Sequence, residues 1–204
     1  VNDKGLFSAA LWNLFDWAPI DQNVSTVIHN SLFMVGAIDA ALRCADVLKA
    51  GRPPEGLADD IRELKKCRAG LVKGVRATWN ERKQSFPDSI HDDGKASPST
   101  SQHTSFLSVL YDVVEKGKQR EAVRNMVSPP KGMVKVGSPF AVMFLYEALE
   151  KIGRPDDIIR SIRDHYQRML DEGATTVWET FPGWEAATLT RSHCHAWSAA
   201  PLRF

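Results

Sequence analysis

The chain has 204 residues, of which 43% are hydrophobic, and this is enough to bury a substantial core in one domain or in a large piece of one. The formal net charge is +1 and basic residues are interleaved with acidic ones, so composition excludes the basic surface that nucleic acids and anionic membranes usually bind. The longest apolar runs, at 31–38 and 139–146, are far shorter than the roughly 20 residues of a membrane-spanning helix, so we expect a soluble chain without a nucleic-acid or membrane partner.

The first part of the chain is predicted to form a loop followed by a helical hairpin. Residues 6–16 contain a short amphipathic piece that leads into a loop, because Pro19 disfavours a helical conformation in the residue before it. Apolar residues recur every three or four positions over 25–50 and again over 57–79, which predicts two long helices. A glycine and two prolines lie between them, so a short turn joins an antiparallel pair.

A polar stretch, 80–101, then interrupts the helical pattern. It is rich in Asp, Ser, Pro and Gly, so we predict a loop. A loop of about 20 residues is unusual in a compact domain and commonly indicates function or disorder. The Asp-Asp-Gly sequence at 92–94 fits an ordinary turn better than a calcium loop, which needs several more oxygen ligands at alternating positions.

Two further hairpins are predicted, from helices at 102–116 and 119–126 and from helices at 140–152 and 156–172. The helix at 140–152 is apolar on nearly all faces, as an inner helix is, whereas the helix at 156–172 has a single apolar stripe, as an outer helix has. This alternation predicts an all-α fold, an incomplete (α/α)6 barrel of antiparallel hairpins with short extended segments in its loops. We expect seven or eight of the twelve helices of a closed barrel.

The cysteines and the first residues carry little functional information. Cys44, Cys67 and Cys194 form no Cys-x-x-Cys pair and leave one unpaired, which argues against a disulfide framework and a structural zinc site, so we expect buried free thiols. The sequence begins with Val1 rather than Met and lacks the pattern of a signal peptide. We therefore expect residues upstream of Val1, and no compartment is predicted.

The stretch 171–201 contains the strongest candidates for chemistry. Gly173 is suited to close the preceding helix, and the β-branched residues 175–177 favour an extended segment that ends at Trp178 and Glu179. A bulky aromatic residue beside a carboxylate fits a sugar-binding and acid–base unit. A buried tryptophan next to a solvated glutamate is the alternative that the local sequence leaves open.

A second group of candidates surrounds His195. His193 and His195 alternate and would both face a metal ion on a strand, but no other ligand lies at a recognisable spacing, so we predict no metal site. His195 is better suited to donate a hydrogen bond to a sugar hydroxyl, with Trp178 and Trp197 offering apolar ring faces. Packing of both tryptophans in the core is an equally good interpretation.

Two segments in this stretch resemble a known family. Gly173-Ala-Thr-Thr-Val-Trp-Glu179, followed by Cys194-His-Ala-Trp-Ser-Ala-Ala-Pro201, is similar to the closing segment of the catalytic domain of bacterial α-L-rhamnosidases, glycoside hydrolase family 78. The resemblance implies an inverting hydrolase of terminal α-L-rhamnose without a cofactor. It implies that Glu179 is the general base and that His195 contacts the sugar. The likeness is firm over 102–201 and looser before it.

The loop that contains Phe15-Asp16-Trp17-Ala18-Pro19 resembles an Asp-Trp element on the active-site rim of family members. We therefore predict that Asp16 and Trp17 bind substrate, with burial of Trp17 in the core as the alternative. Phe86-Pro87-Asp88-Ser89 resembles a segment that faces the barrel mouth in helical-barrel glycosidases, and Gln102-His103-Thr104 resembles the opening of one of their inner helices.

The second carboxyl group of the reaction is not evident. An inverting glycosidase needs two, about 6.5 to 9.5 Å apart. In the family the general acid lies in a segment that we expect upstream of Val1. Asp16, Asp88 and Glu185 are the other candidates, and each fits a solvated or hydrogen-bonded acid better.

We therefore expect residues 1–204 to form one partial catalytic domain, truncated at both ends and inactive alone. Its partners would be the remainder of that domain and a rhamnose-containing oligosaccharide or glycoside. The alternatives are another helical-barrel glycosidase and a non-catalytic carbohydrate-binding fragment, because the fold does not fix the substrate.

Overall fold

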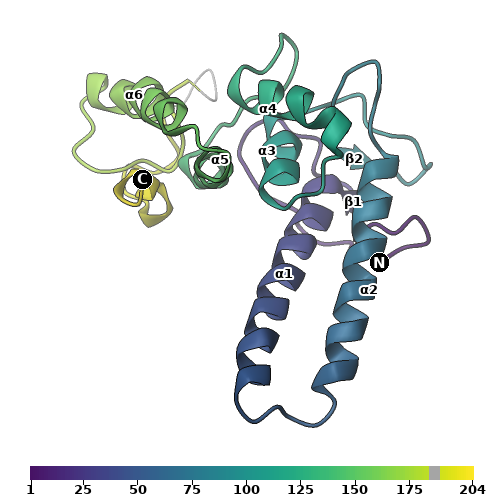
Figure 1. Cartoon of the computed structure of the whole chain (residues 1–204). Coiled ribbons are helices and arrows are strands. Elements are labelled where there is room, and N and C mark those ends of the chain that lie inside the picture. Colours follow the sequence, from purple (N-terminus) through teal and green to yellow (C-terminus); the bar gives the residue numbers. More distant parts are fainter. Residues whose placement is uncertain (184–188) are drawn as a thin grey trace.

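In the computed structural model, which describes residues 1–183 and 189–204, the protein folds into three antiparallel helical hairpins (Figure 1). The six α-helices among these residues are α1 (Ile28–Ala50), α2 (Leu57–Ala77), α3 (Gln102–Leu110), α4 (Gln119–Val127), α5 (Pro139–Lys151) and α6 (Pro155–Asp171). Two short strands, β1 (Thr26–Val27) and β2 (Ser89–Ile90), pair antiparallel. Single turns of 3-10 helix lie at Lys116–Lys118, Ala196–Ser198 and Ala200–Leu202.

The first helix of each hairpin lies in an inner row. α1 packs on α3 and α3 packs on α5, while α2, α4 and α6 pack on the first helix of their own hairpin. Every residue of α3 from Gln102 to Val109 is buried, whereas α6 buries only Asp157, Ile158 and Met169. The prediction of alternating inner and outer helices is therefore confirmed, and the arrangement is that of the wall of a helical barrel.

An aromatic cluster anchors the N-terminal loop to the inner row. The ring of Phe15 meets four other phenylalanine rings edge-on, with centroids 4.9 to 6.2 Å away. They belong to all three inner helices: Phe33 in α1, Phe106 in α3, and Phe140 and Phe144 in α5. Edge-to-face pairs contribute roughly 0.5–1.5 kcal/mol each beyond the area they bury. The loop that carries Asp16 and Trp17 is thus held at one end of the inner helices.

Several predicted elements differ from the structure. The described residues contain six α-helices, so the prediction of seven or eight was wrong. Residues 6–16 form an irregular segment with bends and no helix, since long-range packing through Phe15 fixes them. The helix predicted over 102–116 ends at Leu110, because Asp112 adopts a φ of 55° and the amide of Val113 bonds back to the carbonyl of Ser108.

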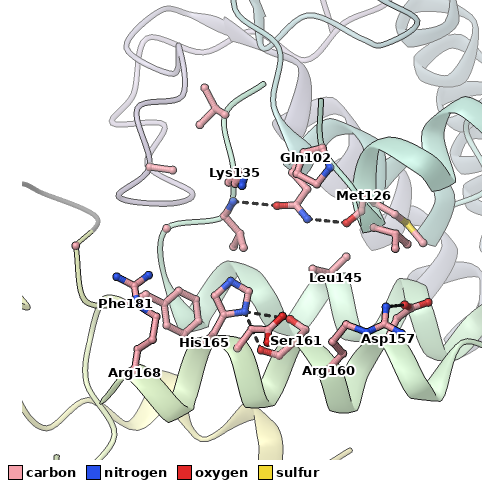
Figure 2. A pocket seen from close by; sticks show the side chains of 18 of the residues that line it. Gln102, Met126, Lys135, Leu145, Asp157, Arg160, Ser161, His165, Arg168 and Phe181 are labelled. Atoms are coloured by element: carbon pink, nitrogen blue, oxygen red, sulfur yellow. Dashed lines mark hydrogen bonds and ion pairs between the residues drawn. The ribbon is translucent and has the colours of Figure 1, made fainter. Parts of the chain in front are cut away.

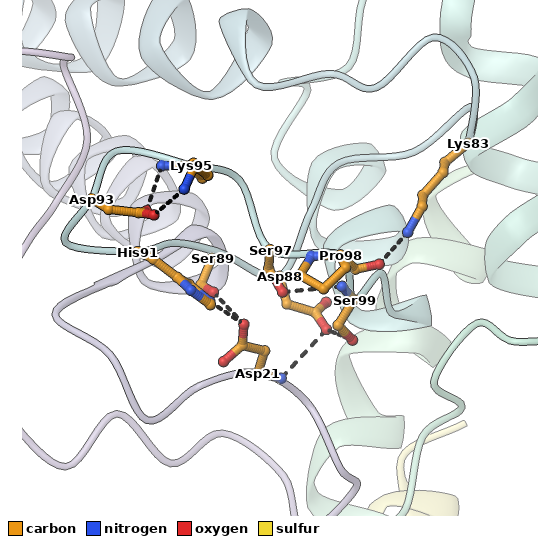
Figure 3. A network of polar contacts seen from close by, with 10 residues as sticks. All are labelled: Asp21, Lys83, Asp88, Ser89, His91, Asp93, Lys95, Ser97, Pro98 and Ser99. Carbon is orange, nitrogen blue, oxygen red and sulfur yellow. Dashed lines mark hydrogen bonds and ion pairs between the residues drawn. The ribbon is translucent and has the colours of Figure 1, made fainter.

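The long polar stretch between α2 and α3 is a loop, as predicted, with β2 in its middle. It is tied to the N-terminal loop by contacts of Asp21 with Ser89 and His91 (Figure 3). All three cysteines are free, but Cys44 and Cys194 are exposed, so the prediction of buried thiols was wrong for these two. Within the described residues, none of the helices combines the length and apolar character needed to cross a bilayer.

Candidate active site

The two segments that follow α6 lie side by side. The amide of Glu179 donates to the carbonyl of Ser192 at 3.0 Å, and the amide of His195 donates to the carbonyl of Val177 at 2.9 Å. α6 ends at Asp171 and Gly173 follows with a φ of 81°, so the chain turns out of the helix where the sequence predicts it. Backbone pairing of the next residues then brings Glu179 and His195 into one site.

The carboxylate of Glu179 is held by Trp17 and Arg191. The indole Nε1 of Trp17 donates to Glu179 Oε1 at 2.9 Å, and Arg191 Nε lies 3.7 Å from the same oxygen. The guanidinium of Arg191 also lies over the Trp17 ring, 3.9 Å from its centroid, as a cation–π pair. Both contacts from the described residues reach Oε1, and the Glu179 side chain is 13% exposed.

A stack of rings lies against the backbone of Glu179. The ring of His195 stacks on Trp197 with centroids 4.0 Å apart, and Trp197 stacks on Phe140 of α5 at 5.2 Å. Trp197 Nε1 donates to the carbonyl of Glu179 at 3.2 Å. His195 and Trp197 are half-buried and lie beside the candidate base, and their contact with a sugar stays a prediction.

Asp16 and Trp178 are placed differently from the other candidates, because their side chains are buried. Trp178 is 3% exposed and meets His193 edge-on, while Asp16 is 2% exposed. Asp16 Oδ1 accepts the amide of Trp17 at 2.7 Å, and Oδ2 accepts from His103 Nε2 at 2.7 Å and from the Gly137 amide at 2.8 Å. Burial and these three bonds argue against direct contact of Asp16 with a sugar, and burial argues likewise for Trp178.

The remaining carboxylates considered from the sequence do not join Glu179 in the described part of the chain. Asp88 is fully buried and its Oδ2 accepts from Ser99 Oγ at 2.6 Å and from the Asp21 amide at 3.5 Å. Glu185 lies outside the described residues. No cluster of three or more His, Cys, Asp or Glu side chains suited to a metal ion occurs in the part of the chain that the structure describes.

Sequence reasoning missed two contributors to the site. Arg191 stands in a polar linker with no periodicity or motif around it, so only the fold reveals its contact with Glu179. His103 belongs to a segment noted for its resemblance to the start of an inner helix, yet its contact with Asp16 joins residues 87 positions apart. Neither pairing has a signal within one stretch of sequence.

A cavity of about 600 Å³ lies next to this site, between the loop after α4 and helices α5 and α6 (Figure 2). Its wall includes Gln102, Lys135, Arg168 and the stacked rings of His165 and Phe181, whose centroids are 4.5 Å apart. Burial lowers the pKa of His165 from its ordinary value. None of the predicted site residues lines the cavity, so the carboxylate of Glu179 is not part of its wall.

The comparisons with known proteins fit this geometry. The family described as the bacterial alpha-L-rhamnosidase 6 hairpin glycosidase domain matches residues 2–204. The chain is similar to the crystal structure of the GH78 family rhamnosidase of Bacillus sp. GL1, with 38% identity over 98% of this chain and a TM-score of 0.88. It is also similar in fold to a rhamnosidase from Klebsiella oxytoca with rhamnose bound, at 20% identity over 98% of this chain and a TM-score of 0.69. No curated protein matches the chain.

The chain corresponds to only part of these solved structures. It spans 21% of the Bacillus chain and 37% of the Klebsiella chain.

Proposed function

This chain belongs to the family of bacterial α-L-rhamnosidase six-hairpin glycosidase domains, and we propose that it supplies the general base of an inverting α-L-rhamnosidase. The observation that supports the proposal is the placement of Glu179. It is a partly exposed carboxylate, oriented by Trp17 and Arg191 and flanked by a stack of aromatic rings. The remainder of a catalytic domain and a rhamnose-containing glycoside would be its partners.

The proposed reaction uses each group at a stated atom. Glu179 Oε2 accepts a proton from a water molecule. At the same time the oxygen of that water attacks the anomeric carbon, on the face opposite the leaving group. A second carboxylic acid, contributed by the remainder of the domain, protonates the departing glycosidic oxygen. The bond to the leaving group breaks as the bond to water forms, so the configuration inverts.

Three side chains around the base are proposed to contact the sugar. His195 offers a ring nitrogen to a hydroxyl, and Trp17 offers the ring face away from Arg191 to the sugar ring. Trp197 stacks on His195 and Phe140, so it offers only the part of its ring that these two leave uncovered. Asp16 and Trp178 are buried, so we propose that they hold these side chains in position and do not contact the sugar.

The test is a chimera in which this chain replaces the matching 21% of the Bacillus rhamnosidase. Glu179→Gln keeps the shape of the side chain but removes its basicity, and we expect kcat on an aryl α-L-rhamnoside to fall about a hundred- to ten-thousandfold. Glu172→Gln, an exposed change just after α6, is the matched control and should retain the parental rate. A Glu179→Gln chimera with near-parental kcat would favour a carbohydrate-binding or structural role instead.

A further inference from the structure

We propose that Asp16 and His103 form a buried positioning pair that holds Glu179 in place, an inference that rests on the function proposed for Glu179. Both side chains of the pair are 0% exposed, and His103 Nε2 lies 2.7 Å from Asp16 Oδ2. Because an ionised carboxylate only accepts hydrogen bonds, His103 donates through Nε2. Asp16 lies in the N-terminal loop and His103 in the first turn of α3, so the pair joins the rim of the site to the inner row.

The first connection from the pair to the base runs through Trp17. Asp16 Oδ1 accepts the backbone amide of Trp17 at 2.7 Å, which fixes the peptide that carries the indole. The indole then donates from Nε1 to Glu179 Oε1 at 2.9 Å. A shift of Asp16 therefore moves the donor that orients the carboxylate of Glu179.

The second connection runs through the loop before α5. Asp16 Oδ2 accepts the amide of Gly137 at 2.8 Å, and the carbonyl of Gly137 accepts the amide of Phe181 at 3.3 Å. Phe181 follows Glu179 by two residues, so this contact fixes the backbone on its far side. A Cβ on Gly137 would lie 2.9 Å from the backbone nitrogen of Ala18, so the close approach of the two loops requires glycine.

The chemistry of the pair explains why His103 matters to both connections. A buried carboxylate is stable only when it is paired and its oxygens are hydrogen-bonded. Asp16 has three donors: two backbone amides and one histidine. Without the histidine, the carboxylate would turn toward water and draw Trp17 and Gly137 with it. A displacement of about 1 Å at a reacting group can cost up to about a hundredfold in rate.

A second buried histidine provides a matched control. His29, in the first turn of α1, is 1% exposed, and its ring centroid lies 5.2 Å from that of Phe15. His103 packs on the same phenylalanine ring at 5.3 Å. Replacing either histidine by leucine therefore disturbs the same part of the core, but of these two histidines it is His103 that donates to Asp16 in the described structure.

The experiment compares three variants in the active chimera: His103→Leu, His103→Gln and His29→Leu. We expect His103→Leu to lower kcat about ten- to a hundredfold while KM changes much less. The acidic limb of its pH–rate profile should move to higher pH, because Glu179 loses a donor to its charged form. His103→Gln restores an N–H at this position and should recover part of the rate. His29→Leu should keep the parental kcat and pH profile.

The pair hypothesis is overturned if His103→Leu retains kcat within about twofold with an unmoved profile, or if His29→Leu produces the same loss and the same shift. If His103→Leu does not fold, Asp16→Asn removes the charge at almost constant volume and must give the same loss and shift; parental kinetics in that variant would overturn the proposal. If the parental chimera is active and His103→Leu leaves its kcat and pH–rate profile unchanged, only this inference is refuted. A folded parental chimera without turnover refutes the proposed function, and the pair with it.

Discussion

The contact between His91 and Asp21 makes part of the stability depend on pH. His91 Nε2 lies 2.6 Å from Asp21 Oδ2, and Ser89 Oγ donates to the same oxygen at 3.0 Å (Figure 3). Burial alone would raise the pKa of Asp21, but hydrogen bonds from His91, Ser97 and Ser89 outweigh it and lower the pKa below 3.8. The same hydrogen bond raises the pKa of His91 above 6.5.

These two shifts predict the pH range in which the contact stabilises the fold. The stabilisation that His91 contributes to the fold is fully present below pH 6.5 and is lost as pH rises through its raised pKa. The stabilisation from Asp21 is fully present above pH 3.8 and is lost as pH falls through its lowered pKa. Between about pH 6 and pH 8.5, the unfolding free energy of the native chain should therefore fall relative to that of His91→Gln. Burial lowers the pKa of His29 and of His165, so these two histidines act in the opposite direction, but they do so equally in both proteins. Urea unfolding at both pH values tests this, with the exposed His193→Gln as control. An unchanged pH slope in His91→Gln would contradict the prediction.

At the scale of single residues, sequence reasoning found candidates better than it found partners. Glu179 and Trp17 were both proposed for the site, and the structure joins them by a hydrogen bond across 162 positions. That pairing has no local signature, since it depends on how the N-terminal loop packs on the inner helices. The same holds for Arg191, whose place is set by the pairing of two irregular segments.

At the scale of elements, two glycines of α2 should respond to alanine in opposite directions. A Cβ on Gly74 would lie 2.5 Å from the carbonyl oxygen of Gly5 and 2.7 Å from that of Lys4, whereas a Cβ on Gly70 would meet nothing within 4 Å. Gly70→Ala should raise the unfolding free energy by about 0.5–1 kcal/mol, because alanine loses less conformational freedom in a helix. Gly74→Ala should lower it by about 1–3 kcal/mol, because backbone atoms must move. Urea denaturation measures the unfolding free energy of both variants. Changes of the same sign in the two variants would contradict the packing described for Gly74.

The helices themselves were predictable because apolar residues recur at three and four positions over long windows. α1 and α2 begin and end within a few residues of their predicted bounds. The misses lie where long-range contacts or backbone conformation decide. Residues 6–16 are fixed by the aromatic cluster around Phe15, and α3 is cut short at Leu110 by the positive φ of Asp112.

At the scale of the whole molecule, the order of packing could be predicted from the faces of the helices. The helix predicted at 140–152 is apolar on most sides and must be covered on most sides, and α5 lies in the inner row accordingly. α3 lies in the same row although many of its buried residues, such as Gln102 and His103, are polar, so an apolar surface does not account for its place. What alternation alone could not predict is which end of that row carries the site. The loop anchored by Phe15 and the segments after α6 meet there, and their meeting is a property of the complete packing.

For the molecule as a whole, we predict that the isolated chain does not hydrolyse an aryl α-L-rhamnoside. The reaction needs a proton donor as well as a base, and the other described carboxylates considered for it, Asp16 and Asp88, are buried and hydrogen-bonded. We expect the folded chain, verified by circular dichroism, to release no phenol from an aryl α-L-rhamnoside, whereas the chimera with the Bacillus enzyme does. Glu179→Gln of the isolated chain, purified in the same way, reveals contaminating activity. Phenol release that scales with the isolated chain and disappears in Glu179→Gln would mean that this chain supplies its own acid.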